Sequence, residues 1–148
     1  MGTFKPIAAL LGLVLALILV APPWRVRAPE DSSAIHVLRT IYAAQIQYQS
    51  TFNKFAATLD QLGPPLATGQ TEGPEAAGLI PHSLASGEAS GYLFAVTGTA
   101  KGFTVVAVPK TFGKTGRRTF YMDQSGIMRQ NWGREPATLN SPEAGSLK

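Results

Sequence analysis

The sequence contains no cysteine and only two histidines, His36 and His82. Without thiols the chain can form no disulfide, no zinc–thiolate site and no lipid attachment through an N-terminal cysteine. The two histidines have no cysteine partners and lie far apart in the sequence, so we expect no metal site. The cysteine content does not indicate the redox compartment, because a chain without cysteine tolerates an oxidising compartment but does not require one.

The sequence also lacks the common catalytic signatures. A Gly-x-Ser-x-Gly elbow does not occur. Gly113-Lys114-Thr115 has Val108 where a phosphate-binding loop needs its first glycine. Asp123 is a lone carboxylate in its turn, whereas calcium takes about six or more oxygen ligands. We therefore expect a protein that is not an enzyme and binds no cofactor.

Charge is missing from one long stretch, residues 6–24, which lies between Lys5 and Arg25 and is rich in leucine. A helix rises about 1.5 Å per residue, so this stretch could span about 28 Å, close to a hydrocarbon core of about 30 Å. The pattern predicts a transmembrane anchor. A cleaved secretory signal remains the alternative, because small residues precede Pro22 and Pro29. Basic residues flank both ends, so charge does not decide the orientation.

Beyond this stretch the chain is long enough for one domain with a modest core. Apolar and aromatic residues recur at three- and four-residue steps and predict a helix over about 33–55, with Asp31, Ser32 and Ser33 as candidate N-caps. The stripe consists of Ile35, Leu38, Ile41, Tyr42, Gln45, Tyr48, Phe52 and Phe55. A long Gly- and Pro-rich connection follows over 56–90, and we expect Leu79-Ile80 and Leu84 to dock it onto the core.

The C-terminal half has the composition of β-strands. Residues 92–96 and 103–108 predict one hairpin, and residues 119–122 and 127–129 predict a second around the turn at 123–126. The expected fold class is α+β: an N-terminal transmembrane helix, then an amphipathic stalk helix packed on a small antiparallel sheet of three to four strands. The expected domains are an anchor with a short linker at 1–28, a globular domain at 29–134 and a flexible tail at 135–148.

Three segments in this order resemble type IV pilin-like proteins and type II secretion pseudopilins. They are the stalk segment 33–48, the loop segment 77–94 and the hairpin 119–129 with its Asp-Gln-Ser-Gly turn. The resemblance implies a pilin-like domain outside the cytoplasm, in the periplasm, on a single-pass anchor in the bacterial inner membrane. It further implies a structural subunit or accessory of a type IV pilus or secretion machine that acts by packing. The implied partners are membrane lipid and other pilin-like subunits or an inner-membrane assembly platform.

The N-terminus departs from this family. Family members enter the apolar stretch through a sequence like Gly-Phe-Thr-Leu-Ile-Glu, in which the Glu pairs with the amino terminus of a neighbouring subunit. Residues 2–7 here read Gly-Thr-Phe-Lys-Pro-Ile and contain no Glu. A buried carboxylate that neutralises an amine is a strong assembly device at low dielectric constant. We therefore expect no self-polymerisation, and the alternative function is a membrane-tethered module that binds an anionic ligand.

Basic residues gather between positions 110 and 134, where the only acidic residue is Asp123 and where Tyr121 and Trp132 are interleaved. Such a face could bind anionic lipid headgroups, nucleic acid or acidic polysaccharide. The alternative is a solvated sheet edge that cations protect from aggregation. The candidate anionic-ligand face consists of Lys110, Lys114, Arg117, Arg118, Arg129 and Arg134.

Overall fold

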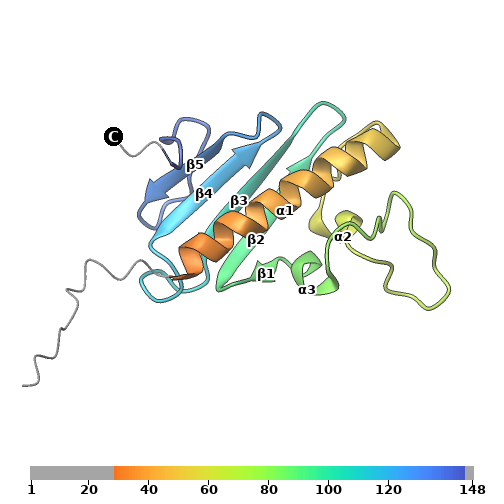
Figure 1. Ribbon diagram of the computed structural model, residues 1–148, viewed down its shortest axis with the longest axis horizontal. Helices are drawn as coiled ribbons and strands as arrows, with labels where there is room; N and C mark the ends of the chain where they lie inside the picture. Colours follow the sequence, from red (N-terminus) through yellow and green to blue (C-terminus); the bar gives the residue numbers. More distant parts are fainter. Residues whose placement is uncertain (1–28, 146–148) are drawn as a thin grey trace, which may run out of the picture.

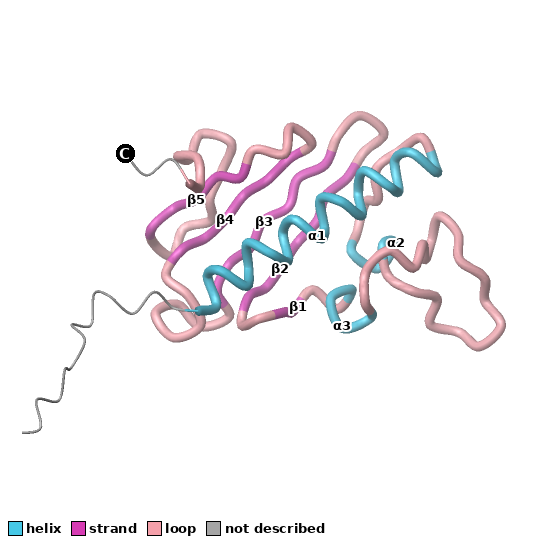
Figure 2. Tube along the Cα trace, viewed as in Figure 1, coloured by secondary structure: helices cyan, strands magenta, loops and turns pink. Residues whose placement is uncertain are grey.

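The computed structural model describes residues 29–145, in which one long helix lies across a five-stranded antiparallel sheet (Figure 1). The helices are α1 (Pro29–Phe52), α2 (Leu59–Leu62) and α3 (His82–Ala85). The strands are β1 (Glu88–Ala89), β2 (Tyr92–Gly98), β3 (Phe103–Pro109), β4 (Arg118–Asp123) and β5 (Met128–Trp132). Each strand pairs with the next one along the chain, so the sheet is a meander in sequence order (Figure 2).

Helix α1 begins four residues earlier than the apolar pattern predicts. Proline is tolerated at the first helical position because the N–H groups of the first turn have no partner within the helix. Asp31 and the serines after it therefore lie inside the helix, and their prediction as N-caps is wrong. The helix ends at Phe52, before Asn53, whose φ of 56° is a left-handed conformation that asparagine adopts at helix ends.

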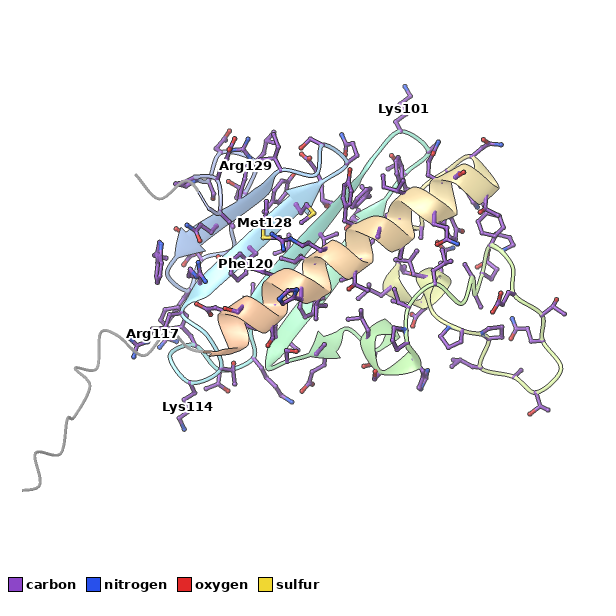
Figure 3. The ribbon with its side chains drawn as sticks, viewed as in Figure 1. Lys101, Lys114, Arg117, Phe120, Met128 and Arg129 are labelled. Carbon is purple, nitrogen blue, oxygen red and sulfur yellow. The ribbon has the colours of Figure 1, made fainter. Side chains whose placement is uncertain are left out.

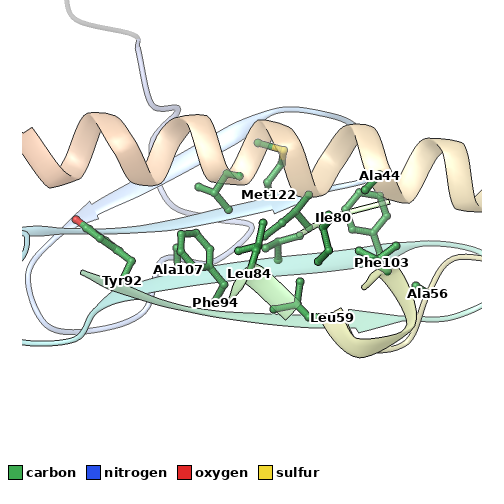
Figure 4. Packing of buried hydrophobic residues seen from close by; sticks show 14 of the residues in the cluster. Ala44, Ala56, Leu59, Ile80, Leu84, Tyr92, Phe94, Phe103, Ala107 and Met122 are labelled. Atoms are coloured by element: carbon green, nitrogen blue, oxygen red, sulfur yellow. The ribbon is translucent and has the colours of Figure 1, made fainter. Parts of the chain in front are cut away.

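The core lies between α1 and the face of the sheet that it covers (Figure 4). Side chains of a strand alternate between the two faces, so every second residue of β2, β3 and β4 points toward the helix. The buried hydrophobic positions on these strands are Tyr92, Phe94, Phe103, Val105, Ala107, Phe120 and Met122, and they form one cluster with Ala34, Leu38, Ile41, Ala44 and Tyr48 of α1. The two predicted hairpins are present as β2–β3 and β4–β5.

The long connection 53–87 is docked at the edge of the sheet that carries β1. Ile80 and Leu84 are buried, as the sequence predicts, and Leu59 and Leu62 of α2 join them. The hydroxyl of Tyr48 donates a hydrogen bond to the carbonyl of Pro74 at 2.5 Å. This connection therefore closes one end of the core.

The segment after β5 is also packed. Ala137 is buried, and the Thr119 hydroxyl donates to the carbonyl of Glu135 at 2.7 Å. Farther along, the amides of Gln130 and Ala144 complete a short ladder between β5 and residues 142–144. The described residues 135–145 therefore form specific contacts with β4 and β5, and the flexibility of this tail stays a prediction.

The predicted fold class needs two further corrections. The sheet has five strands and not three or four, because β1 is a two-residue strand that no sequence pattern marks. The predicted transmembrane helix falls on residues outside the described part of the chain. Within residues 29–145, no helix combines the length and apolar character that crossing a bilayer requires.

Candidate functional site

The six predicted basic residues do not form one face. Arg118 is buried at the start of β4, and Arg129 points toward the segment after β5 (Figure 3). The other four are exposed and belong to the end of the domain where α1 begins. We call this group the basic rim: Lys110, Lys114, Arg117 and Arg134.

Arg118 is held in a buried polar cluster with the first turn of α1. Its Nε lies 2.9 Å from Oδ2 of Asp31, and its Nη1 lies 2.8 Å from Oε1 of Gln130. The guanidinium carbon lies 5.2 Å from the ring centre of Phe120 and 5.1 Å from that of Trp132. Arg118 therefore stabilises the fold, and its guanidinium is already engaged by partners within the domain.

Tyr92 completes this cluster from β2. Its hydroxyl donates to Oδ1 of Asp31 at 2.5 Å and also lies 3.0 Å from the carbonyl oxygen of Arg118. Burial, and then the hydrogen bond to Asp31, raises the pKa of the Tyr92 hydroxyl above its ordinary value. The backbone N–H of Arg117 donates to the same carboxylate oxygen at 3.3 Å. Asp31 thus fastens the start of α1 to β2 and to the loop before β4.

Two other members of the predicted face have partners. Nη1 of Arg129 donates to the carbonyl of Ser141 at 3.0 Å, and its Nη2 lies 4.0 Å from Glu143. Nζ of Lys110 lies 2.5 Å from Oε1 of Glu88, with both side chains about half exposed. A surface pair of this kind contributes little and is easily exchanged for another partner.

Lys114 and Arg117 are exposed and form no ion pair within the described side chains. Figure 3 shows both at the end of the domain where α1 starts, pointing away from the sheet. Arg134 lies next to this loop, because its guanidinium carbon lies 5.2 Å from the ring centre of Phe112. The basic rim is thus a surface of separate cations and not a cavity.

A groove of about 420 Å³ runs between α1 and the β4–β5 side of the sheet. Its lining includes Ile35, Arg39, Tyr42, Met128 and Trp132. These residues come from segments far apart in the chain, so no sequence pattern predicts the groove. Within the described residues, no three His, Cys, Asp or Glu side chains are grouped as a metal site requires.

The outer face of α1 carries almost no charge. Between Ser32 and Asn53 the only Lys, Arg, Asp or Glu is Arg39. The exposed residues of this stretch are Ser32, His36, Arg39, Thr40, Ala43, Ile46, Gln47, Ser50, Thr51 and Asn53. Two of the hydroxyls bond to their own helix, Thr40 to the carbonyl of His36 at 3.1 Å and Thr51 to that of Gln47 at 3.0 Å. The shortage of charged residues over 32–53 can be read from the sequence, but the apolar stripe alone does not show that it lies on the outer face of the helix.

The chain was also compared with known proteins. No family model, curated protein or solved structure matches it.

Proposed function

We propose that the protein is a membrane-anchored, pseudopilin-like structural subunit or accessory of a pilus or secretion machine. It acts by packing against other pilin-like subunits or an inner-membrane assembly platform, and not by catalysis. In this proposal the domain of residues 29–145 lies outside the cytoplasm, on the bacterial inner membrane. The resemblance of the stalk segment, the loop and the second hairpin to this family motivates the proposal.

The observation that carries the proposal is the nearly uncharged outer face of α1. A helix that faces water on one side normally presents charged residues there. Charged residues are instead depleted in the central part of protein interfaces. Ala43, Ile46 and Gln47 lie on this outer face, and Ile46 is 41% exposed. A face of small, apolar and neutral residues along a long helix suits close contact with a neighbouring subunit.

The experiment uses a deletion strain of the native host, complemented with full-length variants. Surface pili are counted by electron microscopy, and secreted proteins are compared by gel electrophoresis. We expect the deletion to impair one of these outputs and the wild-type chain to restore it. The double variant Ala43→Glu, Gln47→Glu should fail to restore it, because two carboxylates would then be desolvated in the interface. Glutamate is a good helix former, so the helix itself should persist.

A matched control is Gln70→Glu, Thr71→Glu, which adds the same charge in an exposed loop. This variant should restore function fully, and immunoblots should show equal amounts of all variants. A deletion strain with unchanged pili and secretion would contradict the proposed function. Full restoration by the helix variant would contradict the role of the outer face of α1.

A further inference from the structure

The basic rim lies at the end of the domain that is closest along the chain to the charge-free stretch. Asp31, in the first turn of α1, accepts hydrogen bonds from the backbone of Arg117 and from the side chain of Arg118. The loop 110–117 is therefore fixed beside the start of the helix. Trp24, the last residue of the charge-free stretch, precedes Pro29 by five residues. A chain extends at most about 3.6 Å per residue, so this connection reaches no more than about 18 Å.

Aromatic side chains accompany the cations at this end. Arg134 stacks on Phe112, and the ring of Trp132 is 67% exposed at the end of β5. Tryptophan and long basic side chains are the residues that suit the interface between water and a bilayer, because each combines an apolar part with a polar tip. Hydrogen-bonded register places Trp132 opposite Arg118, at the same end of the sheet as the rim.

The carboxylates at this end are partly neutralised. Asp31 is paired with the buried Arg118, and Glu88 is paired with Lys110. Two acidic residues remain at this end, Glu135 directly after Arg134 and Glu30 in the first turn of α1, whereas Asp123 lies at the far end of β4. Lys114, Arg117 and Arg134 outnumber these two acids by one charge, and the three basic side chains are exposed to solvent.

We propose that the basic rim binds the headgroups of anionic phospholipids and so orients the domain against the membrane that anchors it. The inference rests on the proposed function, because the anchor is what holds so few cations close to a lipid surface. A tether raises the effective concentration of the surface, so weak contacts suffice. Nucleic acid is the less suitable ligand, since non-specific binding to a duplex rests on neutralising about six to ten phosphates.

The test uses the absence of cysteine, which makes one introduced thiol the only site for a label. Full-length Thr111→Cys carries a donor fluorophore beside the rim, and Ala100→Cys carries it at the β2–β3 turn, at the opposite end of the domain. Both positions are exposed. The proteins are reconstituted into vesicles of phosphatidylcholine, with or without phosphatidylglycerol, that contain an acceptor-labelled lipid. Energy transfer then reports the distance of each label from the bilayer.

We expect transfer from position 111, and not from position 100, to rise when phosphatidylglycerol is present. About 0.5 M sodium chloride should abolish the rise, because the charges are exposed to screening. The variant Lys114→Gln, Arg117→Gln should lower the ratio of docked to undocked domain about 25-fold, at about fivefold per cation. The control Lys54→Gln, Lys101→Gln removes two exposed cations away from the rim and should leave transfer unchanged.

The other possible results contradict the lipid proposal, the choice of lipid over nucleic acid, or the anchor. Equal transfer from position 111 in the two kinds of vesicle, or an unaltered rise in the rim variant, overturns the proposal. Loss of transfer on adding duplex DNA at equal phosphate concentration overturns the choice of lipid. Flotation with phosphatidylcholine vesicles tests the anchor itself. A protein that floats only with vesicles that contain phosphatidylglycerol would support lipid binding by the rim and contradict the membrane anchor. A protein that floats with neither kind of vesicle would contradict both.

Discussion

Asp31 and Arg118 form a buried salt bridge, with 2.9 Å between Oδ2 and Nε and with each side chain less than a tenth exposed. The pair joins the first turn of α1 to the start of β4, two segments separated by 87 positions in the sequence. Tyr92, Gln130 and the backbone N–H of Arg117 supply further hydrogen bonds, so all of these buried polar side chains have partners. This cluster fixes the position of the N-terminal end of α1, beside which the basic rim lies.

The first prediction concerns this pair. Asp31→Ala should lower the free energy of unfolding by about 3–5 kcal/mol, because it leaves the guanidinium of Arg118 buried without a counter-charge. The double variant Asp31→Leu, Arg118→Met should lose much less, since apolar residues of similar size replace both charges. Urea denaturation followed by circular dichroism measures both values. A loss below about 1 kcal/mol in the single variant would show that the pair is not desolvated.

The second prediction concerns alkaline pH. Burial raises the pKa of the Tyr92 hydroxyl, whereas an unfolded tyrosine ionises near pH 10. The unfolded chain therefore releases a proton that the folded chain retains, so the stabilisation is complete below about pH 10 and is lost as pH rises further. Tyr92 alone should contribute a loss of about 1.4 kcal/mol per pH unit above that point. Tyr92→Phe should show a correspondingly smaller slope, and parallel stability curves for the two proteins would disprove the assignment.

The third prediction concerns Gln45, which is fully buried on α1. Its amide pairs with the backbone of Ala56 in both directions, with Nε2 donating to the carbonyl and Oε1 accepting from the N–H, each at 2.9 Å. Gln45→Glu removes the donor and should cost at least about 1–3 kcal/mol at neutral pH. Gln47→Glu, on the exposed side of the same helix, is the matched control and should be nearly neutral. Thermal unfolding compares them, and equal stabilities would mean that the amide pairing adds nothing.

The elements with strong periodicity were predictable. The spacing from Ile35 to Phe52 predicts the helix because a 3.6-residue repeat places these side chains on one face. The Asp-Gln-Ser-Gly turn was predictable because a tight turn needs a residue with positive φ, which glycine adopts without strain. Gly126 has a φ of 75° in this turn. β1 was not predictable, because two residues cannot display an alternation. The packing of residues 135–145 was also missed, since a Pro- and Gly-containing segment shows its order only through contacts made elsewhere.

The basic residues were recognisable as a group, but their roles were not. Arg118 is the first residue of β4 and reaches the first turn of α1, whereas its neighbour Arg117 lies in the bend just before the strand. One is therefore buried against Asp31, and the other is exposed in the rim. Charge counted along the chain takes no account of which face of the sheet a residue occupies or which carboxylate lies opposite it.

The sequence by itself determined the long helix and the two hairpins, because these follow from local spacing. It also determined the number of basic residues and the scarcity of charge along the helix, because these follow from composition. Only the tertiary structure decided that Asp31 pairs with Arg118, that Gln45 pairs with the backbone of Ala56 and that four of the six cations gather where α1 begins. Those outcomes depend on which distant segments meet. Such contacts form when the helix and sheet bury their common apolar face, and no local pattern contains them.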